Sequence, residues 1–215
     1  MTDQDGSSRQ IRPTSDVAFT DTVKEIQTRK GSRAGYARME DKGGWRDRIT
    51  EDLAAFLASR DSFYLSTANA AGHPYIQHRG GMPGFIRVLD DKTFAFADFK
   101  GNRQYITQGN LAENPQAFIF LMDYPNRRRI KIWGRAHVVE DDAHLIADLM
   151  VPGYEAEPEQ AIVFEITAWD SNCPQHILPR YTHADVVRAV APLKERIAEL
   201  EARLAAAGLT PDPVS

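Results

Sequence analysis

The sequence has 215 residues, a length that suits one large domain or one domain with helical extensions. Hydrophobic residues make up 42% and charged residues 26%, which excludes a wholly disordered chain. The formal net charge of −4 argues against a dedicated nucleic-acid-binding protein, which would carry a basic excess. The single cysteine, Cys173, cannot form an internal disulfide, so nothing in the composition indicates an oxidising compartment.

Two further features bear on where the protein works. The longest apolar runs, such as residues 117–122, span about six residues, whereas a membrane-spanning helix needs roughly 20. The first residues are acidic and polar, without the basic start and apolar stretch of a secretory signal. We therefore expect a cytoplasmic protein that acts without a membrane or nucleic-acid partner.

The N-terminal part of the sequence predicts helices. Residues 1–14 are polar and are expected to form a frayed tail. Apolar residues at helical spacing predict a helix over residues 16–29, ended by Gly31, and residues 35–45 are expected to form an aromatic loop. Thr50 is then expected to cap a short helix with acidic residues in its first turn.

From residue 62 onwards the hydrophobic period changes from helical to alternating, which predicts strands. A hairpin is expected over residues 62–79, with strands over residues 62–68 and 74–79 and a turn over residues 69–72. Further strands are predicted over residues 85–89, 93–97, 117–122, 129–139 and 161–168, and helices over residues 103–113 and 141–150. Short, evenly spaced strands with few long helices predict a mainly β fold, an antiparallel sheet closed into a barrel, rather than a parallel βαβ sheet.

The C-terminal part is predicted to be helical. Its apolar residues alternate spacings of four and three, as in a coiled-coil seam, and they are Val186, Val190, Leu193, Ile197, Leu200 and Leu204. Pro192 lies inside this run, so we expect a new helix to begin near it rather than one continuous helix. Two interpretations stay open, a helix packed on its own domain and a helix paired with a second subunit. The expected organisation is an N-terminal extension (1–48), a barrel domain (49–181) and a C-terminal helix and tail (182–215).

A loop between a predicted strand and a predicted helix, residues 96–104, carries the groups that bind a phosphate monoester. Backbone N–H groups at a helix N-terminus and the guanidinium of Arg103 suit such a ligand. Asn102 is also a good helix N-cap, which is the alternative explanation of that residue.

Three other segments concentrate polar side chains. One strand face is expected to carry a basic stripe, either a binding surface or a solvated face, formed by Arg127, Arg129 and Lys131. Residues 75–81 end a strand with an amide, an imidazole and a guanidinium before two glycines. Residues 169–177 place an indole, a thiol, an imidazole and amides after a strand, a set suited to the edge of a flat heteroaromatic ring. Cys173 and His176 alone make a poor zinc site, and no metal is expected.

Several familiar catalytic motifs are missing from the sequence. It contains no G-x-G-x-x-G after a strand, no G-x-x-x-x-G-K-[ST], no H-E-x-x-H and no G-x-S-x-G. Dinucleotide-binding Rossmann proteins, P-loop proteins, zincins and α/β-hydrolases are therefore excluded.

Taken in order, the segments resemble the pyridoxamine 5′-phosphate oxidase superfamily, the FMN-binding split barrels. The resemblance runs from Ile49 to Arg180 and rests on residues 66–75, 88–96, 101–103, 110–115 and 129–134. Residues 172–177 are similar to a signature of an uncharacterised bacterial subgroup of these flavoproteins. The resemblance implies an FMN-binding split barrel of antiparallel Greek-key type that forms a homodimer, with two FMN sites across the dimer interface.

The resemblance also implies roles for individual residues. Arg103 falls where the family binds the FMN phosphate, Asn102 replaces an assisting serine, and Gln104 stands where the oxidases carry a lysine. Arg79 is the candidate to replace that lysine's charge. The strand beneath the flavin ring and ribityl chain would contribute Gln77, His78, Arg79 and Gly80, and the opposite side Ala97 and Asp98. Arg129 falls where the family has a glutamine near the flavin. The site would be closed, from the same chain or from the partner subunit, by the loop with Asn172, Cys173, Gln175 and His176.

The sequence departs from the family at both ends. It has no match to the C-terminal Arg-x-His type substrate signature, and it begins with an additional stretch that contains Arg33, Tyr36, Arg38 and Trp45. We therefore expect an FMN-dependent oxidoreductase that acts on an unidentified small organic substrate or a nicotinamide, not on pyridoxamine phosphate. His176 is the candidate proton donor at the flavin, because histidine exchanges protons near neutral pH, and a structural loop histidine is the alternative. Rival functions are a flavin- or haem-binding sensor, a haem-degrading barrel and a deazaflavin-dependent reductase.

Overall fold

The computed structural model describes residues 12–172 and 174–209. The chain divides into two compact units. The first contains the described residues up to Asp123 and those from Arg128 to Pro174, and the second contains Tyr124–Arg127 and the residues from Gln175 onwards. None of the helices in the described residues combines the length and the apolarity that crossing a lipid bilayer requires.

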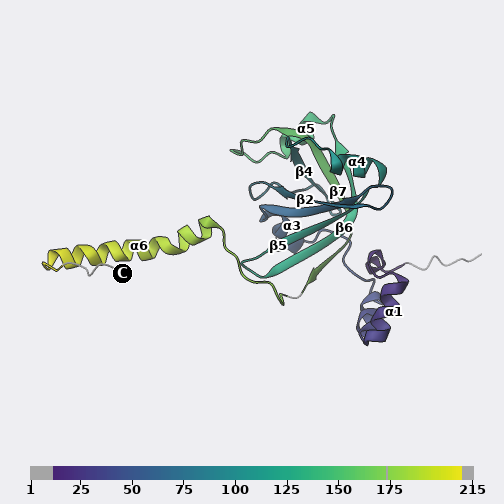
Figure 1. The fold of residues 1–215 in the computed structure, drawn as a ribbon, viewed down its shortest axis with the longest axis horizontal. Helices are drawn as coiled ribbons and strands as arrows, with labels where there is room; N and C mark the ends of the chain where they lie inside the picture. Colours follow the sequence, from purple (N-terminus) through teal and green to yellow (C-terminus); the bar gives the residue numbers. More distant parts are fainter. Residues whose placement is uncertain (1–11, 173, 210–215) are drawn as a thin grey trace, which may run out of the picture. The chain divides into compact units, whose positions relative to one another are not determined.

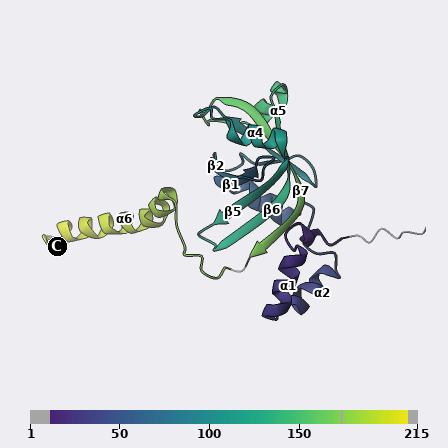
Figure 2. The same cartoon turned by 45° about the vertical axis from the view of Figure 1, so that its right-hand side comes forward.

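The first unit is built on an antiparallel sheet. Figure 1 shows this sheet. Within the described residues, seven strands follow the spatial order β2-β1-β5-β6-β7-β4-β3. They are β1 (Ser62–Ala68), β2 (Pro74–Gly80), β3 (Arg87–Val88), β4 (Thr93–Phe99), β5 (Gln116–Asp123), β6 (Arg128–Val139) and β7 (Pro158–Asn172). Strands β5, β6 and β7 form a meander (Figure 2), and β4 lies beside β7, so β4 to β7 form a Greek key. The predicted mainly β, antiparallel fold is confirmed.

The core lies on the inner face of this sheet and is covered by α3 (Glu51–Ala58), which Thr50 caps as predicted. Large side chains at alternating strand positions are fully buried, namely Phe63, Leu65, Phe94, Phe96, Ile119, Leu121, Ile130, Ile132 and Phe164. Gly134 of β6 leaves room for close packing, because a Cβ atom there would overlap the backbone oxygen of Glu165 and the ring of Phe164.

Most predicted elements are present, with shifted ends. The strand predicted over residues 85–89 is reduced to β3, because Phe85 and Ile86 are buried in the core instead of extending the ladder. The helix predicted from residue 103 is α4 (Ile106–Glu113), which begins three residues later. The helix predicted over residues 141–150 is α5 (Ala143–Asp148).

The N-terminal segment differs most from the prediction. A 3-10 turn, η1 (Thr14–Val17), precedes α1 (Asp21–Lys30). The helix α1 begins at residue 21, later than predicted, because the Thr20 hydroxyl accepts a hydrogen bond from the backbone N–H of Val23 and caps the helix there. The expectation of a loop over residues 35–45 is wrong for its first half, because residues 35–40 belong to the helix α2 (Arg33–Glu40). An ion pair between Arg33 and Glu40 joins the two ends of α2, which lies beside α1 (Figure 2).

Aromatic side chains attach this segment to the outer face of the sheet. The ring centroid of Phe19 lies 5.0 Å from that of Tyr36 and 4.9 Å from that of Trp45. Trp45 in turn stacks on Trp133 of β6 at 4.7 Å. The ammonium of Lys131 lies 5.5 Å from the Trp45 ring and 5.3 Å from the Trp133 ring, so a cation also holds this contact together.

The second unit contains the long helix α6 (His183–Ala206). It begins with a capping box in which Thr182 and Asp185 bond each other's backbone N–H groups, and the Thr182 hydroxyl lowers the pKa of Asp185. The expectation of a new helix near Pro192 is wrong, because α6 continues through it. Proline leaves the carbonyl of Arg188 without its helical partner, but both residues are exposed, so water can bind that carbonyl.

Candidate functional site

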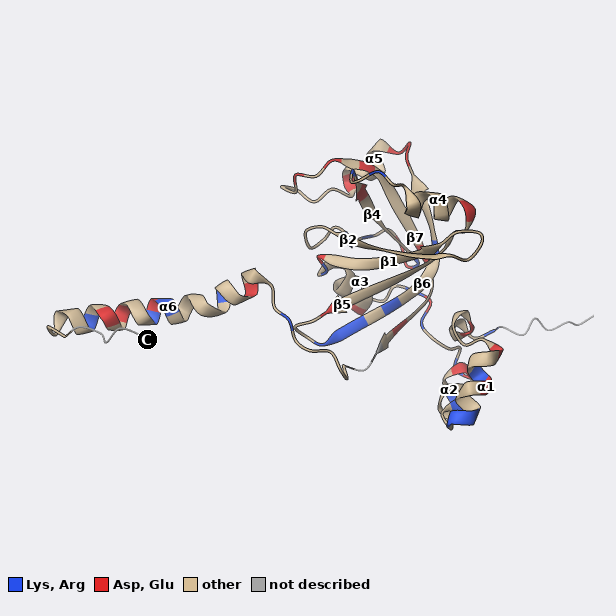
Figure 3. Ribbon diagram, viewed as in Figure 1, with Lys and Arg blue, Asp and Glu red and all other residues tan. Residues whose placement is uncertain are grey.

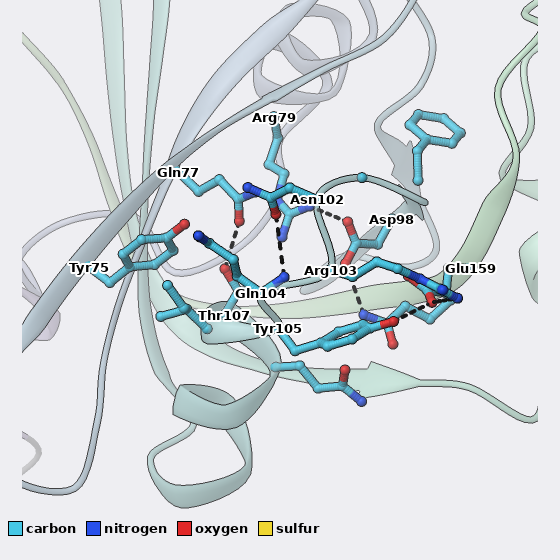
Figure 4. Close-up of a pocket in the computed structure, with 15 residues that line it drawn as sticks. Tyr75, Gln77, Arg79, Asp98, Asn102, Arg103, Gln104, Tyr105, Thr107 and Glu159 are labelled. Carbon is cyan, nitrogen blue, oxygen red and sulfur yellow. Dashed lines mark hydrogen bonds and ion pairs between the residues drawn. The ribbon is translucent and has the colours of Figure 1, made fainter.

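A cavity of about 290 Å³ opens between β2, the start of α4 and β7 (Figure 4). Its walls come from three strands, the loop after β4 and the first turn of α4. Six of the predicted site residues line it, namely Gln77, Arg79, Asp98, Asn102, Arg103 and Gln104. Its volume lies near the lower end of the range of about 300–1,000 Å³ typical of small-molecule sites.

Strand β2 supplies one wall through its alternation. Tyr75, Gln77 and Arg79 share the half-buried face that lines the cavity, whereas Ile76 and His78 point to the other side and are exposed. The hydroxyl of Thr107 on α4 donates to Oε1 of Gln77 over 2.9 Å. Because its oxygen is engaged, the Gln77 amide presents its N–H groups as the remaining donors.

An ion pair closes the inner end of the cavity. Nη1 of Arg79 donates to Oδ1 of Asp98, and the two side chains are only 13% and 12% exposed. The second oxygen of Asp98 accepts from Nε2 of the buried Gln160 over 2.9 Å. Nε of Arg79 is buried and has no hydrogen-bond partner in the described part of the chain. The guanidinium is therefore neutralised but retains an unused donor.

A second ion pair lies at the outer end of the cavity. Nη2 of Arg103 is 3.6 Å from Oε1 of Glu159, and the Arg103 side chain is 57% exposed. The phenol of Tyr105 donates to the same Glu159 oxygen over 2.7 Å, and this hydrogen bond raises the pKa of Tyr105. Figure 4 shows the three side chains together along one edge of the cavity. At this distance and exposure the guanidinium of Arg103 is free to exchange Glu159 for another anion.

The loop that carries Arg103 ends in an uncapped helix. Tyr105 is the N-cap residue of α4, and within the described chain no side chain accepts from the first N–H groups of this helix. Asn102 is not the cap; its side-chain oxygen lies 3.4 Å from the backbone N of Gln104 within the loop. Arg103 and Tyr105 have φ angles of 59° and 52°, a left-handed conformation that costs roughly 1–2 kcal/mol per non-glycine residue. The loop therefore holds a strained shape just before the uncapped start of α4, whose first-turn residues line the cavity.

A second cavity of about 240 Å³ adjoins the first and shares Arg79 and Asp98 with it. It brings in three more predicted site residues, His78, Gly80 and Ala97. The fold thus gathers the predicted residues of β2, β4 and the following loop around two adjoining cavities.

Arg129 lies outside this group. It is on β6, opposite Met122 of β5 in the ladder, and lines neither of the two cavities. Arg129 and Lys131 share the outer strand face while Ile130 and Ile132 are buried, as the alternation predicts. Arg127 precedes β6, in a turn with a φ of 53°. The expectation that Arg127 belongs to the basic stripe is therefore wrong.

The loop after β7 is described only in part. Asn172 ends β7, its side chain lies outside the described part of the chain, and Cys173 lies outside it altogether. Gln175 and His176 belong to the second unit, where His176 has a φ of 64°. The roles of these four residues stay predictions.

Nine lining residues were not among the predicted site residues, and they include Tyr75, Tyr105, Thr107, Glu159 and Gln160. Alternation along β2 could have indicated Tyr75, since it shares a face with Gln77. Nothing local indicates Glu159 and Gln160, because they reach the cavity through the pairing of β7 with β4, in which Gln160 lies opposite Asp98.

No curated protein sequence matches the chain. Similar solved structures include HupZ of Group A Streptococcus, at 18% identity over 62% of this chain and 99% of that chain, with a TM-score of 0.47. A putative pyridoxamine 5′-phosphate oxidase from Lactobacillus delbrueckii is 20% identical over 58% of this chain and 95% of that chain, with a TM-score of 0.45. An FMN-binding protein from Syntrophomonas wolfei is 14% identical over 68% of this chain and 97% of that chain, with a TM-score of 0.46.

The decisive comparison is with a family model. The model described as pyridoxamine 5′-phosphate oxidase matches residues 49–173, more than half of the sequence. This range holds the whole sheet up to the end of β7 and every residue that lines the two cavities. The chain belongs to the pyridoxamine 5′-phosphate oxidase family, as the order of its sequence segments indicated.

Proposed function

We propose that the chain binds FMN in the cavity between β2 and α4 and acts as a flavin-dependent oxidoreductase on a small organic substrate or a nicotinamide. The observation that carries this proposal is the start of α4. Its uncapped N–H groups and the exposed guanidinium of Arg103 lie at the same cavity. A helix N-terminus beside an arginine suits the phosphate of such a cofactor.

The other residues of the cavity fit the rest of the molecule. Gln77 offers amide N–H groups, and the buried Nε of Arg79 is a donor without a partner in the described chain. The rings of Tyr75 and Tyr105 add flat apolar surface at the cavity wall. Because Asp98 already neutralises Arg79, the charge left for the phosphate is that of Arg103.

When bound, FMN would supply the electron and hydride transfer. The residues of this chain would position it. Arg103 and the α4 N–H groups would bind the phosphate, and Gln77, held by Thr107, would donate to the ring or the ribityl chain. The Arg79–Asp98 pair, with Gln160 on the second carboxylate oxygen, would fix the inner wall.

The proposal includes a homodimer with the cofactor site completed at the subunit interface. The modest volume of the cavity in one chain, about 290 Å³, supports it, because a flavin mononucleotide needs more enclosing surface. The absence of a match to the C-terminal signature of the true oxidases supports a substrate other than pyridoxamine phosphate.

The first experiment is the visible absorption spectrum of the purified protein, with mass spectrometry of whatever heat denaturation releases. We expect a two-band flavin spectrum and released FMN. Arg103→Ala should weaken FMN binding by at least about tenfold, since a hydrogen bond to a charged group is worth about 1.5–3 kcal/mol. Arg135→Ala, which removes an exposed arginine on β6 away from the cavity, is the matched control and should bind FMN normally.

Each alternative has its own outcome. A colourless protein that takes up no added FMN would contradict the proposal, and a Soret band would indicate haem instead. An unchanged dissociation constant for FMN in Arg103→Ala would remove the phosphate assignment. Bound flavin that neither a nicotinamide nor another donor reduces under anaerobic conditions would indicate a sensor rather than an enzyme.

A further inference from the structure

Helix α6 carries an apolar strip that no other described part of the second unit covers. No residue of α6 is buried, and Leu193 and Ile197 are 61% and 55% exposed. Its 24 residues make a helix about 36 Å long at 1.5 Å per residue, enough for three heptads. A helix of this length with an exposed apolar strip is typical of one that pairs with another helix.

The residue types along the strip specify the kind of pairing. With Val186 at a d position, the d positions are Val186, Leu193 and Leu200, and the a positions are Val190, Ile197 and Leu204. β-Branched residues at a with leucine at d favour a parallel pair of two helices. The two central heptads follow this rule, with Val190 and Ile197 at a, and Leu193 and Leu200 at d.

The charges beside the strip favour the same arrangement. Arg196 is at a g position and Glu201 at the following e position, and in a parallel, in-register pair these positions of the two chains face each other. Because the two chains are related by symmetry, the attraction between Arg196 and Glu201 occurs twice in the pair. An antiparallel pair would instead bring g positions together, and these are Arg196 and Arg203, which repel. Figure 3 shows the acidic and basic bands of α6 close together in its C-terminal half.

Pro192 is compatible with this pairing. It occupies a c position, on the side of the helix away from the strip, and Arg188, whose carbonyl it leaves free, occupies an f position. The capping box at Thr182 and the ion pair of Arg203 with Glu199 stabilise the helix before it pairs.

We propose that α6 forms a parallel, in-register, two-stranded coiled coil with α6 of a second copy of this chain. The two-fold axis of such a coil runs along its length, so both sheet units are tethered at the same end. This raises the effective concentration of one sheet unit around the other. The proposal does not depend on FMN binding, and it names a contact separate from any contact between the sheets.

The test uses cysteine cross-linking in the full-length chain, with Cys173→Ser as the background. Val186→Cys places a thiol at a d position near the start of α6, where a parallel, in-register pair brings the two thiols together. We expect a disulfide-linked dimer under mild oxidation. In an antiparallel pair the two thiols would lie more than about 25 Å apart. Arg188→Cys, two residues away at an outward f position, is the matched control and should cross-link at least about tenfold more slowly.

Three outcomes would overturn the proposal. They are the absence of a cross-link in Val186→Cys, equal rates in Val186→Cys and Arg188→Cys, and cross-linking of Val186→Cys to Leu204→Cys in a mixture. The last result would show an antiparallel pair. A dimeric mass alone does not decide the question, because contacts between the sheets would produce the same mass.

Charge reversal tests the pairing of Arg196 with Glu201 of the partner subunit. In the Val186→Cys background, Arg196→Glu or Glu201→Arg alone should slow cross-linking about threefold or more, because two symmetric attractions become repulsions. The double reversal should restore the rate. If the double variant is as slow as the single ones, the charges do not face each other and the in-register arrangement is wrong.

Discussion

The cavity contains two arginine–carboxylate pairs that differ in burial. Arg79 and Asp98 are 13% and 12% exposed, and Gln160 holds the second carboxylate oxygen. Arg103 and Glu159 are 57% and 29% exposed, and their charged atoms lie 3.6 Å apart. The same two chemical groups thus serve as a fixed part of the fold in one place and as an exchangeable pair in the other. Burial decides this, because a buried charge that loses its partner cannot turn to water.

The largest effect should come from breaking the buried pair. Asp98→Ala leaves the Arg79 guanidinium buried without a counter-charge and should lower the free energy of unfolding by about 3–5 kcal/mol. Glu159→Ala, the matched change in the exposed pair, should alter it by no more than about 1 kcal/mol. Urea denaturation of both variants measures the difference. Equal losses would show that burial does not distinguish the pairs.

Arg103→Lys tests the exposed pair as a binding group. Lysine keeps the charge but cannot form two parallel hydrogen bonds to a phosphate, so FMN affinity should fall about tenfold while the free energy of unfolding stays within about 0.5 kcal/mol. Fluorescence titration with FMN measures the affinity. Unchanged binding would mean that Arg103 contributes charge alone.

Glu159→Gln should have a smaller effect in the opposite direction. Removing the carboxylate that competes for Arg103 should strengthen FMN binding about two- to fivefold, the scale of an exposed ion pair. Riboflavin lacks the phosphate and is the control ligand, whose affinity should not change. An equal gain for riboflavin would show that Glu159 acts on the ring rather than on the phosphate.

The smallest effect concerns the phenol of Tyr105. Its hydrogen bond to Glu159 raises the folded-state pKa, so any stability it contributes is present below the ordinary tyrosine pKa of about 10 and is lost as the pH rises through the raised value. Glu159→Gln should return the pKa of Tyr105 towards its ordinary range. Ultraviolet titration of tyrosinate measures this shift, with Tyr105→Phe identifying the signal. An unchanged titration in Glu159→Gln would show that Glu159 does not raise the pKa of Tyr105.

The strands were the most predictable part of the fold. The alternation in residues 62–68 placed β1 with the observed bounds, because every second side chain there is buried against one core. The helix α2 was missed, since contacts with another segment, such as that of Tyr36 with Phe19, help to hold it in place. The break expected at Pro192 was wrong because Pro192 and Arg188 are exposed, so the helix continues with one hydrogen bond replaced by water.

The candidate site was predictable where its residues are adjacent in sequence. Gln77 with Arg79, and Asn102 with Arg103, lie within two short segments whose side-chain chemistry is visible without a structure. Whether these side chains are buried or exposed could not be predicted from the sequence. The sequence allowed Arg79 to replace a missing lysine, whereas the fold engages that guanidinium with Asp98.

The sequence by itself determined the alternating strands, the donors of the loop after β4 and the heptad pattern of α6, because each depends on neighbours along the chain. Only the tertiary structure decided which arginine is exposed and which is buried. The pairing of β7 with β4 sets Gln160 opposite Asp98 and brings Glu159 to Arg103. That pairing joins residues about sixty positions apart, and no local pattern encodes the burial of the charges that meet there.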